Sequence, residues 1–151
     1  MKTLQLPKIH ILLGEDDPDD SMLFIQALDE TKLTSVVNIA DNGAKFVDHV
    51  DGKSNSVPDI IFLDVNMPLK NGIECLQALR SKDDYKSVPV IMYSTSGTKG
   101  EIESCYEKGA NYYVVKPFSF DAIKKMVSDF CTRDWRADVN RNLKNFVISF
   151  E

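Results

Sequence analysis

The sequence predicts an α/β fold built on a parallel sheet with helices on both faces. Short apolar runs are nearly continuous rather than alternating, which is typical of strands that are covered on both sides. Segments with helical spacing separate these runs, and strand and helix alternate five times along the chain. Such an alternation favours a parallel sheet whose strands are joined by right-handed crossovers.

The expected strands are, in chain order, 9–13, 35–40, 60–63, 88–93 and 112–115, and the second of them is the weakest in apolar character. The helices between them carry recognisable start and stop signals. Asp17 before Pro18 and Ser119 are expected N-caps, Gly109 is an expected helix stop, and the dipeptides Asn42-Gly43 and Asn71-Gly72 precede two further helical stripes.

Length and composition exclude several classes of protein. The 151 residues suit one globular domain, and 43% apolar with 27% charged residues is ordinary for a folded chain. A net charge of -5 argues against general binding to nucleic acid, and the apolar runs are too short to span a bilayer. The three cysteines show no metal-binding spacing, so a reduced, cytoplasmic protein is expected.

The alternation stops near the end of the chain, which divides the sequence into two parts. Residues 1–131 carry the strands and helices, and residues 132–151 form an extension. Aromatic and aliphatic residues such as Trp135, Phe146 and Phe150 make this extension too apolar for a free tail. We expect it either to fold back on the domain or to lie at a dimer or partner interface.

Polar and charged side chains gather where the predicted strands end. In a parallel α/β sheet, ligands bind at this carboxyl edge. The residues that follow the strands there are Glu15, Asp16 and Asp17; Asp64; Ser94 and Thr95; and Lys116 and Pro117. The opposite edge offers no matching set of charges, so the sequence predicts a functional site at the carboxyl edge.

The residue types at this edge point to phosphoryl transfer. Glu15, Asp16 and Asp64 crowd negative charge, and an all-oxygen ligand set without His or Cys selects a hard cation such as Mg²⁺. Asp64 ends an apolar strand, where it is held rigidly as a nucleophile requires. Lys116 and Ser94 can neutralise or hydrogen-bond phosphoryl oxygens, so the expected product is an acyl phosphate on Asp64.

These motifs resemble the receiver domain of bacterial two-component response regulators. The segment 11–17 is similar to the family's first strand with its acidic pair, here Glu15 and Asp16. The segments 64–68 with Asn71-Gly72, 89–94 and 113–118 are similar to those around the phosphoacceptor, the switch hydroxyl and the conserved lysine with its proline, Pro117. The match covers residues 8–131, and the segment 70–72 with the connection 81–88 looks like small regulators that serve phytochrome-type kinases.

The resemblance implies a flavodoxin-like, doubly wound five-stranded sheet in the order 2-1-3-4-5. Asp64 would accept phosphate from a sensor histidine kinase or a histidine phosphotransfer protein. Asp16, Asp64 and the carbonyl of Asn66 would bind Mg²⁺, and Glu15 would act through water. Ser94, Thr95 and Lys116 would contact the phosphate.

The resemblance also implies a switch. Ser94 would turn toward the phosphoryl group, and Tyr113 would swing inward to fill the space. The output would be a changed affinity of the surface formed by residues 98–131 for an unknown protein target, and a homodimer through the same residues is a further expectation.

Other functions stay open at this stage. The chain could be a phosphorelay intermediate, or a receiver-like interaction module that is never phosphorylated. An enzyme with an aspartyl-phosphate intermediate is disfavoured, because such enzymes usually need a second Asp two positions after the nucleophile, where this chain has Asn66.

Overall fold

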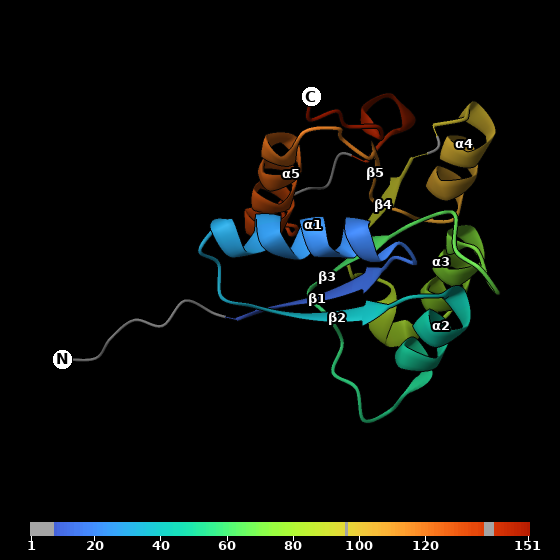
Figure 1. Cartoon of the computed structure of the whole chain (residues 1–151). Helices are drawn as coiled ribbons and strands as arrows, with labels where there is room; N and C mark the ends of the chain where they lie inside the picture. The colour runs from blue at the N-terminus through green and yellow to red at the C-terminus, as the bar shows by residue number, and fades with distance from the viewer. Residues whose placement is uncertain (1–7, 96, 138–140) are drawn as a thin grey trace.

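The computed structural model describes residues 8–95, 97–137 and 141–151, and in them five parallel strands form one sheet (Figure 1). The strands are β1 (Ile9–Gly14), β2 (Ser35–Ala40), β3 (Ile60–Leu63), β4 (Val90–Ser94) and β5 (Tyr112–Val115). Their order in the sheet is β2-β1-β3-β4-β5. This order confirms the predicted doubly wound fold.

The helices are α1 (Pro18–Glu30), α2 (Gly43–Asp51), α3 (Gly72–Arg80), α4 (Lys99–Glu107) and α5 (Phe120–Thr132), with single turns η1 (Asp83–Tyr85) and η2 (Leu143–Asn145). The side chains of Asp17 and Ser119 accept hydrogen bonds from the first turns of α1 and α5, which confirms both as N-caps. Gly109 follows α4 with φ of 98°, a left-handed conformation that ends the helix at low cost, as predicted.

Helices cover both faces of the sheet (Figure 1). On one face, α1 and α5 lie side by side and bury an aromatic cluster that includes Phe24, Phe62 and Phe130. On the other face, α2, α3 and α4 enclose a second core around Phe46 and Leu76. The inner strands β1, β3 and β4 are buried between these layers, which explains why their sequences are continuous in apolar residues.

Three strand boundaries differ from the sequence-based expectation. β4 begins at Val90 rather than Val88, because Pro89 has no N–H to donate and Val88 still belongs to the preceding turn, where its N–H donates to the Tyr85 carbonyl. β1 continues to Gly14 and β4 to Ser94, each one residue beyond the expected end. The three other strands have the predicted bounds.

Backbone hydrogen bonds fix the residues that follow the strands. The Asp64 N–H donates to the Gly14 carbonyl at 2.9 Å, and the Lys116 N–H donates to the Ser94 carbonyl at 2.8 Å. The Glu15 N–H donates to the Ala40 carbonyl at 3.0 Å. Each of these residues is therefore tied to the last residue of the neighbouring strand, and their side chains leave from one rigid edge.

Gly72 is required by the close approach of α3 to this edge. Its N–H donates to the Val65 carbonyl at 2.8 Å, and a Cβ at this position would lie 2.1 Å from the carbonyl oxygen of Asp64. We expect Gly72→Ala to lower the free energy of unfolding by about 3 kcal/mol, because backbone must move to relieve the overlap. Denaturant titration measures this loss.

Gly100 offers a matched control for that titration. It lies in the first turn of α4, and a Cβ there would meet no atom within 4 Å. Gly100→Ala is expected to raise stability by up to about 1 kcal/mol through helix propensity. Equal stability of Gly72→Ala and the unchanged chain would contradict the packing argument.

Parts of the two predicted segments lie outside the described residues, namely 1–7 and 96 of the segment 1–131 and 138–140 of the extension 132–151. Within the described part of the chain, none of the helices has the length and apolar composition that crossing a bilayer requires.

Candidate functional site

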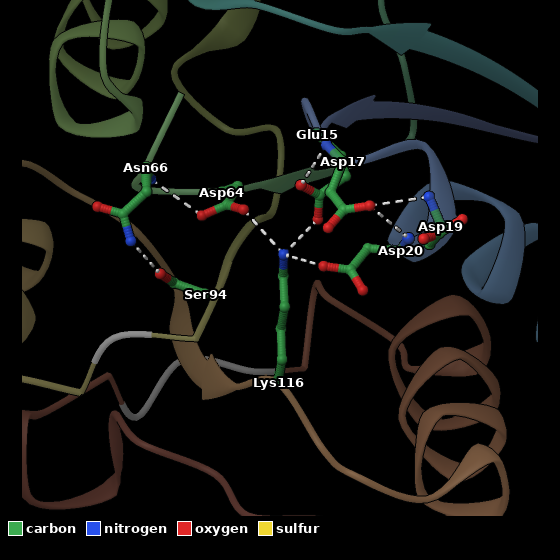
Figure 2. Close-up of polar contacts among 8 residues, drawn as sticks. All are labelled: Glu15, Asp17, Asp19, Asp20, Asp64, Asn66, Ser94 and Lys116. Carbon is green, nitrogen blue, oxygen red and sulfur yellow. Dashed lines mark hydrogen bonds and ion pairs between the residues drawn. The ribbon is translucent and has the colours of Figure 1, made fainter. Parts of the chain in front are cut away.

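The side chain of Lys116 is the centre of the charged cluster at the carboxyl edge (Figure 2). Its Nζ lies 2.5 Å from Glu15 Oε1, 2.8 Å from Asp64 Oδ2 and 2.8 Å from Asp20 Oδ2. Glu15 and Asp64 are almost fully buried, at 1% and 4% exposure. One ammonium group thus joins carboxylates from the ends of β1 and β3 and from the first turn of α1.

Three carboxylates in this cluster form a group that suits a hard cation. Ligand oxygens of Glu15, Asp16 and Asp64 all lie within 4.8 Å of one another, and Asp16 is exposed to solvent. Carboxylates without His or Cys are the ligands that Mg²⁺ prefers, and an open side leaves room for waters, which Mg²⁺ usually keeps. The donor set therefore fits the predicted magnesium site.

Burial and mutual charge shift the protonation of the cluster. Burial raises the pKa of Glu15 to about 8, with the charge of Asp64 adding to the effect and the hydrogen bond from Lys116 opposing it. Burial acts to lower the pKa of Lys116, but hydrogen bonds to Asp20, Asp64 and Glu15 outweigh it and raise that pKa above its ordinary value. Lys116 is therefore charged throughout the physiological range.

The raised pKa of Glu15 predicts a pH-dependent difference in stability for Glu15→Gln without metal. The stabilising contribution of Glu15 is complete below its ordinary pKa of 4.5 and is lost as the pH rises to about 8. Gln carries no charge and its amide oxygen can still accept from Lys116. We expect Glu15→Gln to equal the unchanged chain near pH 4.5 and to exceed its stability by up to about 5 kcal/mol above pH 8.

Denaturant titrations with a chelator, from pH 4.5 upward, measure this difference. Asp19→Asn serves as the control, since Asp19 is an exposed acid in the nearby first turn of α1 and makes no ion pair with Lys116. If the free energies of unfolding of Glu15→Gln and the unchanged chain differ by the same amount at every pH from 4.5 upward, Glu15 is already ionised in the folded chain at pH 4.5.

A second set of polar contacts runs from Asp64 to the sheet edge at β5. The Asn66 N–H donates to Asp64 Oδ1 at 2.9 Å, and Asn66 Nδ2 donates to Ser94 Oγ at 3.3 Å (Figure 2). The side chains of Ser94 and Tyr113 are also hydrogen-bonded to each other, and burial raises the pKa of Tyr113 to about 12. Both side chains are fully buried. Tyr113 therefore lies inward in this structure, and its movement on phosphorylation stays a prediction.

The structure brings most of the expected site residues together and adds one. Glu15, Asp64 and Lys116 are in direct contact, and Ser94 connects to Asp64 through Asn66, whereas Thr95 is exposed at the start of the loop and Pro117 is half-buried after Lys116. The added residue is Asp20, which lies in the first turn of α1 and is not among the site residues expected from the sequence. Its ion pair with Lys116 makes it a member of the cluster. The first turn of α1 brings the Asp20 side chain back toward the end of β1, where Glu15 lies.

Comparison with known proteins identifies the family. The model of the response regulator receiver domain matches residues 11–128, which is more than half of the chain. The chain belongs to the response regulator receiver family. The response regulator Rcp1 of a Synechocystis strain is 32% identical over 125 residues, which cover 80% of this chain and 84% of Rcp1.

Solved receiver structures agree with this assignment. The phosphorylated cyanobacterial phytochrome response regulator RcpA superposes with a TM-score of 0.77 at 27% identity, over 89% of this chain and 98% of RcpA. The Mn²⁺-bound form of Rcp1 superposes with a TM-score of 0.74 at 28% identity, over 89% of this chain and 99% of that chain. This receiver domain therefore has relatives that have been observed with a phosphoryl group and with a divalent cation.

Proposed function

We propose that this chain is a single-domain response regulator that accepts a phosphoryl group on Asp64 from a histidine kinase and signals by protein contact. The observation that carries the proposal is a buried carboxylate, Asp64, whose Oδ2 lies 2.8 Å from the Lys116 ammonium and which shares a cluster with Glu15 and Asp16. Residues 1–131 would form the receiver and residues 132–151 its extension.

The transfer follows from the chemistry of these groups. A carboxylate oxygen of Asp64 attacks phosphorus, the phosphorus–nitrogen bond of the phosphohistidine breaks, and the electron pair leaves with the imidazole, which takes up a proton from solvent. Lys116 would neutralise charge on the phosphoryl oxygens, and Ser94 would donate a hydrogen bond to one of them, which their contacts with Asp64 and Asn66 support. The product is an acyl phosphate.

The acidic cluster would hold Mg²⁺ through Glu15, Asp16, Asp64 and the carbonyl of Asn66. When bound, the cation lowers the repulsion between Asp64 and the incoming phosphoryl group. The Mn²⁺-bound form of Rcp1 supports this part of the proposal.

Asn66 supports an acceptor role over an aspartyl-phosphate enzyme. An enzyme of that kind needs a carboxyl group two positions after the nucleophile as general acid. Here the side-chain amide of Asn66 donates to Ser94 and cannot supply that proton at neutral pH. The downstream event is therefore a changed interaction with a protein target.

Mass spectrometry of the intact chain tests the proposal. Incubation with acetyl phosphate and Mg²⁺ is expected to add one phosphoryl group, and a chelator is expected to prevent the addition. No addition while Mg²⁺ is shown to bind would contradict the proposal and favour a receiver-like module that acts by contact alone.

Asp20 is predicted to weaken the hold of Lys116 on a phosphoryl group, because it occupies the same ammonium. Asp20→Asn removes a negative charge beside the site and leaves the side chain's shape. We expect about five-fold tighter binding of beryllofluoride, a phosphoryl mimic, at saturating Mg²⁺. Titration measures this affinity, Asp19→Asn is the control, and weaker binding in Asp20→Asn would show that Asp20 instead positions Lys116 for the anion.

A further inference from the structure

Residues 141–150, here called the C-terminal segment, lie along the outer edge of β5. The Tyr113 N–H donates to the Phe146 carbonyl, and the Ile148 N–H donates to the Tyr113 carbonyl, both at 3.0 Å. Val147 and Tyr113 thereby form a parallel bridge. In Figure 1 the red end of the chain follows the edge of the sheet between α4 and α5. The segment therefore occupies a strand edge that would otherwise be open.

Side chains attach the C-terminal segment to both flanking helices. Phe146 is only 1% exposed, and its ring centroid lies 5.3 Å from that of Tyr106 on α4. The Arg141 guanidinium stacks 4.0 Å above the Tyr106 ring and donates to the carbonyls of Tyr106 and Ala110. On the other side, the ring of Phe150 lies 5.6 Å from that of Phe130 on α5. The segment thus covers the centre of the surface formed by residues 98–131.

Tyr113 connects the C-terminal segment to the phosphoacceptor site. Its backbone makes both hydrogen bonds to the segment, and its ring packs against Phe146 with centroids 6.3 Å apart. Its hydroxyl is hydrogen-bonded to Ser94, which accepts from Asn66, and the Asn66 N–H donates to Asp64. A continuous set of contacts therefore leads from Asp64 to the segment, and Phe146 packs where it favours the inward position of Tyr113.

We propose that the edge of β5 is a docking site for the chain's own C-terminal segment, and that docking of the segment and phosphorylation of Asp64 stabilise each other. The inference rests on the proposed function. When a phosphoryl group on Asp64 draws the Ser94 side chain toward it, Ser94 leaves a space that the Tyr113 ring fills in its inward position. The docked segment favours the same inward position of Tyr113. Two events that favour the same conformation each strengthen the other by the same factor.

The coupling changes what the receiver presents to a partner. The docked segment takes both backbone hydrogen-bonding positions of Tyr113 on β5, so a partner meets a surface that includes the segment rather than bare β5. A homodimer through residues 98–131 would have to include or displace the segment. Phosphorylation would then act by tightening a composite surface made of α4, the segment and α5.

Amide hydrogen exchange on the full chain tests the proposal, with Mg²⁺ alone and with Mg²⁺ and beryllofluoride. The Asn66 amide reports the site and the Ile148 amide reports docking, because they donate to Asp64 and to the Tyr113 carbonyl. We expect beryllofluoride to slow exchange at both, by about ten-fold at Ile148.

Variants test the reciprocal effect. Phe146→Ala is expected to weaken beryllofluoride binding by up to about ten-fold. Arg141→Ala, at the start of the C-terminal segment, is a milder change with an effect in the same direction. Leu143→Ala is the matched control, since Leu143 belongs to the same segment but is 47% exposed. Arg141→Ala leaves the buried Phe146 in place. If Phe146→Ala does not fold, Arg141→Ala still tests the coupling.

The possible outcomes separate the two proposals. Slower exchange at Asn66 on addition of beryllofluoride, with unchanged or faster exchange at Ile148, would overturn the coupling and leave the proposed function standing. Equal beryllofluoride affinity of Arg141→Ala and Leu143→Ala would do the same. No response at Asn66 and no uptake of phosphate would overturn both. Exchange at Ile148 that slows with rising protein concentration would assign the docking site to the segment of a second copy and overturn intramolecular docking.

Discussion

The Asp64→Asn variant is expected to gain no phosphoryl group from acetyl phosphate and Mg²⁺, under conditions in which the unchanged chain gains one. An amide oxygen is a much weaker nucleophile than a carboxylate, and no other carboxylate in the cluster combines burial, a rigid strand end and contact with both Lys116 and Asn66. The expected loss is complete.

The variant is also expected to keep the fold. The single amide oxygen of asparagine can accept from the Asn66 N–H in place of Asp64 Oδ1. Lys116 then loses its contact with Asp64 Oδ2 but keeps Glu15 and Asp20 as partners, so neither donor is left unpaired. Circular dichroism and intact mass measured on the same sample check both points, with Asp19→Asn as control. Uptake of phosphate by folded Asp64→Asn would assign the acceptor to another residue.

Replacing Lys116 by alanine is expected to separate cation binding from signalling. The change removes the ammonium that Glu15, Asp20 and Asp64 share, so metal-free Lys116→Ala should lose about 2–3 kcal/mol of stability. Mg²⁺ should restore part of that stability, because the carboxylates that bind it remain. The phosphorylated variant should show no change at the surface of residues 98–131.

Denaturant titration with and without Mg²⁺ measures the first effect, and fluorescence of Trp135 measures the second. Trp135 is the single tryptophan and stacks on Phe130 of α5, with centroids 6.1 Å apart. Lys125→Ala, which removes an exposed lysine of α5, is the control. A phosphorylation-dependent fluorescence change that survives in Lys116→Ala would contradict the role given to Lys116.

The sheet and its helices were predictable because their signals are local. Continuous apolar runs mark strands that are covered on both faces, and residues such as Asp17 and Ser119 cap a helix with their own side chains. The start of β4 was placed too early because the apolar pattern continues through Val88 and Pro89, while hydrogen bonding does not.

The residues missed by sequence reasoning depend on contacts between distant parts of the chain. Asp20 reads as an ordinary acid at a helix start, and its ion pair with Lys116 arises only once α1 lies over the ends of β1 and β5. Likewise, the apolar character of Phe146 and Ile148 indicates burial, but only the fold shows an open edge at β5 for them to join. Tyr113 is buried in the same place, where its ring packs against Phe146.

Locating the phosphoryl group on the chain tests the central claim most directly. After reaction with acetyl phosphate and Mg²⁺, borohydride reduces an aspartyl phosphate to homoserine with release of phosphate, and peptide mass mapping finds the altered residue. We expect homoserine at position 64 and a chelator to abolish it. A reduced residue at Glu15, Asp16 or Asp20, or an unmodified chain that nevertheless binds Mg²⁺, would contradict the assignment of Asp64 as phosphoacceptor.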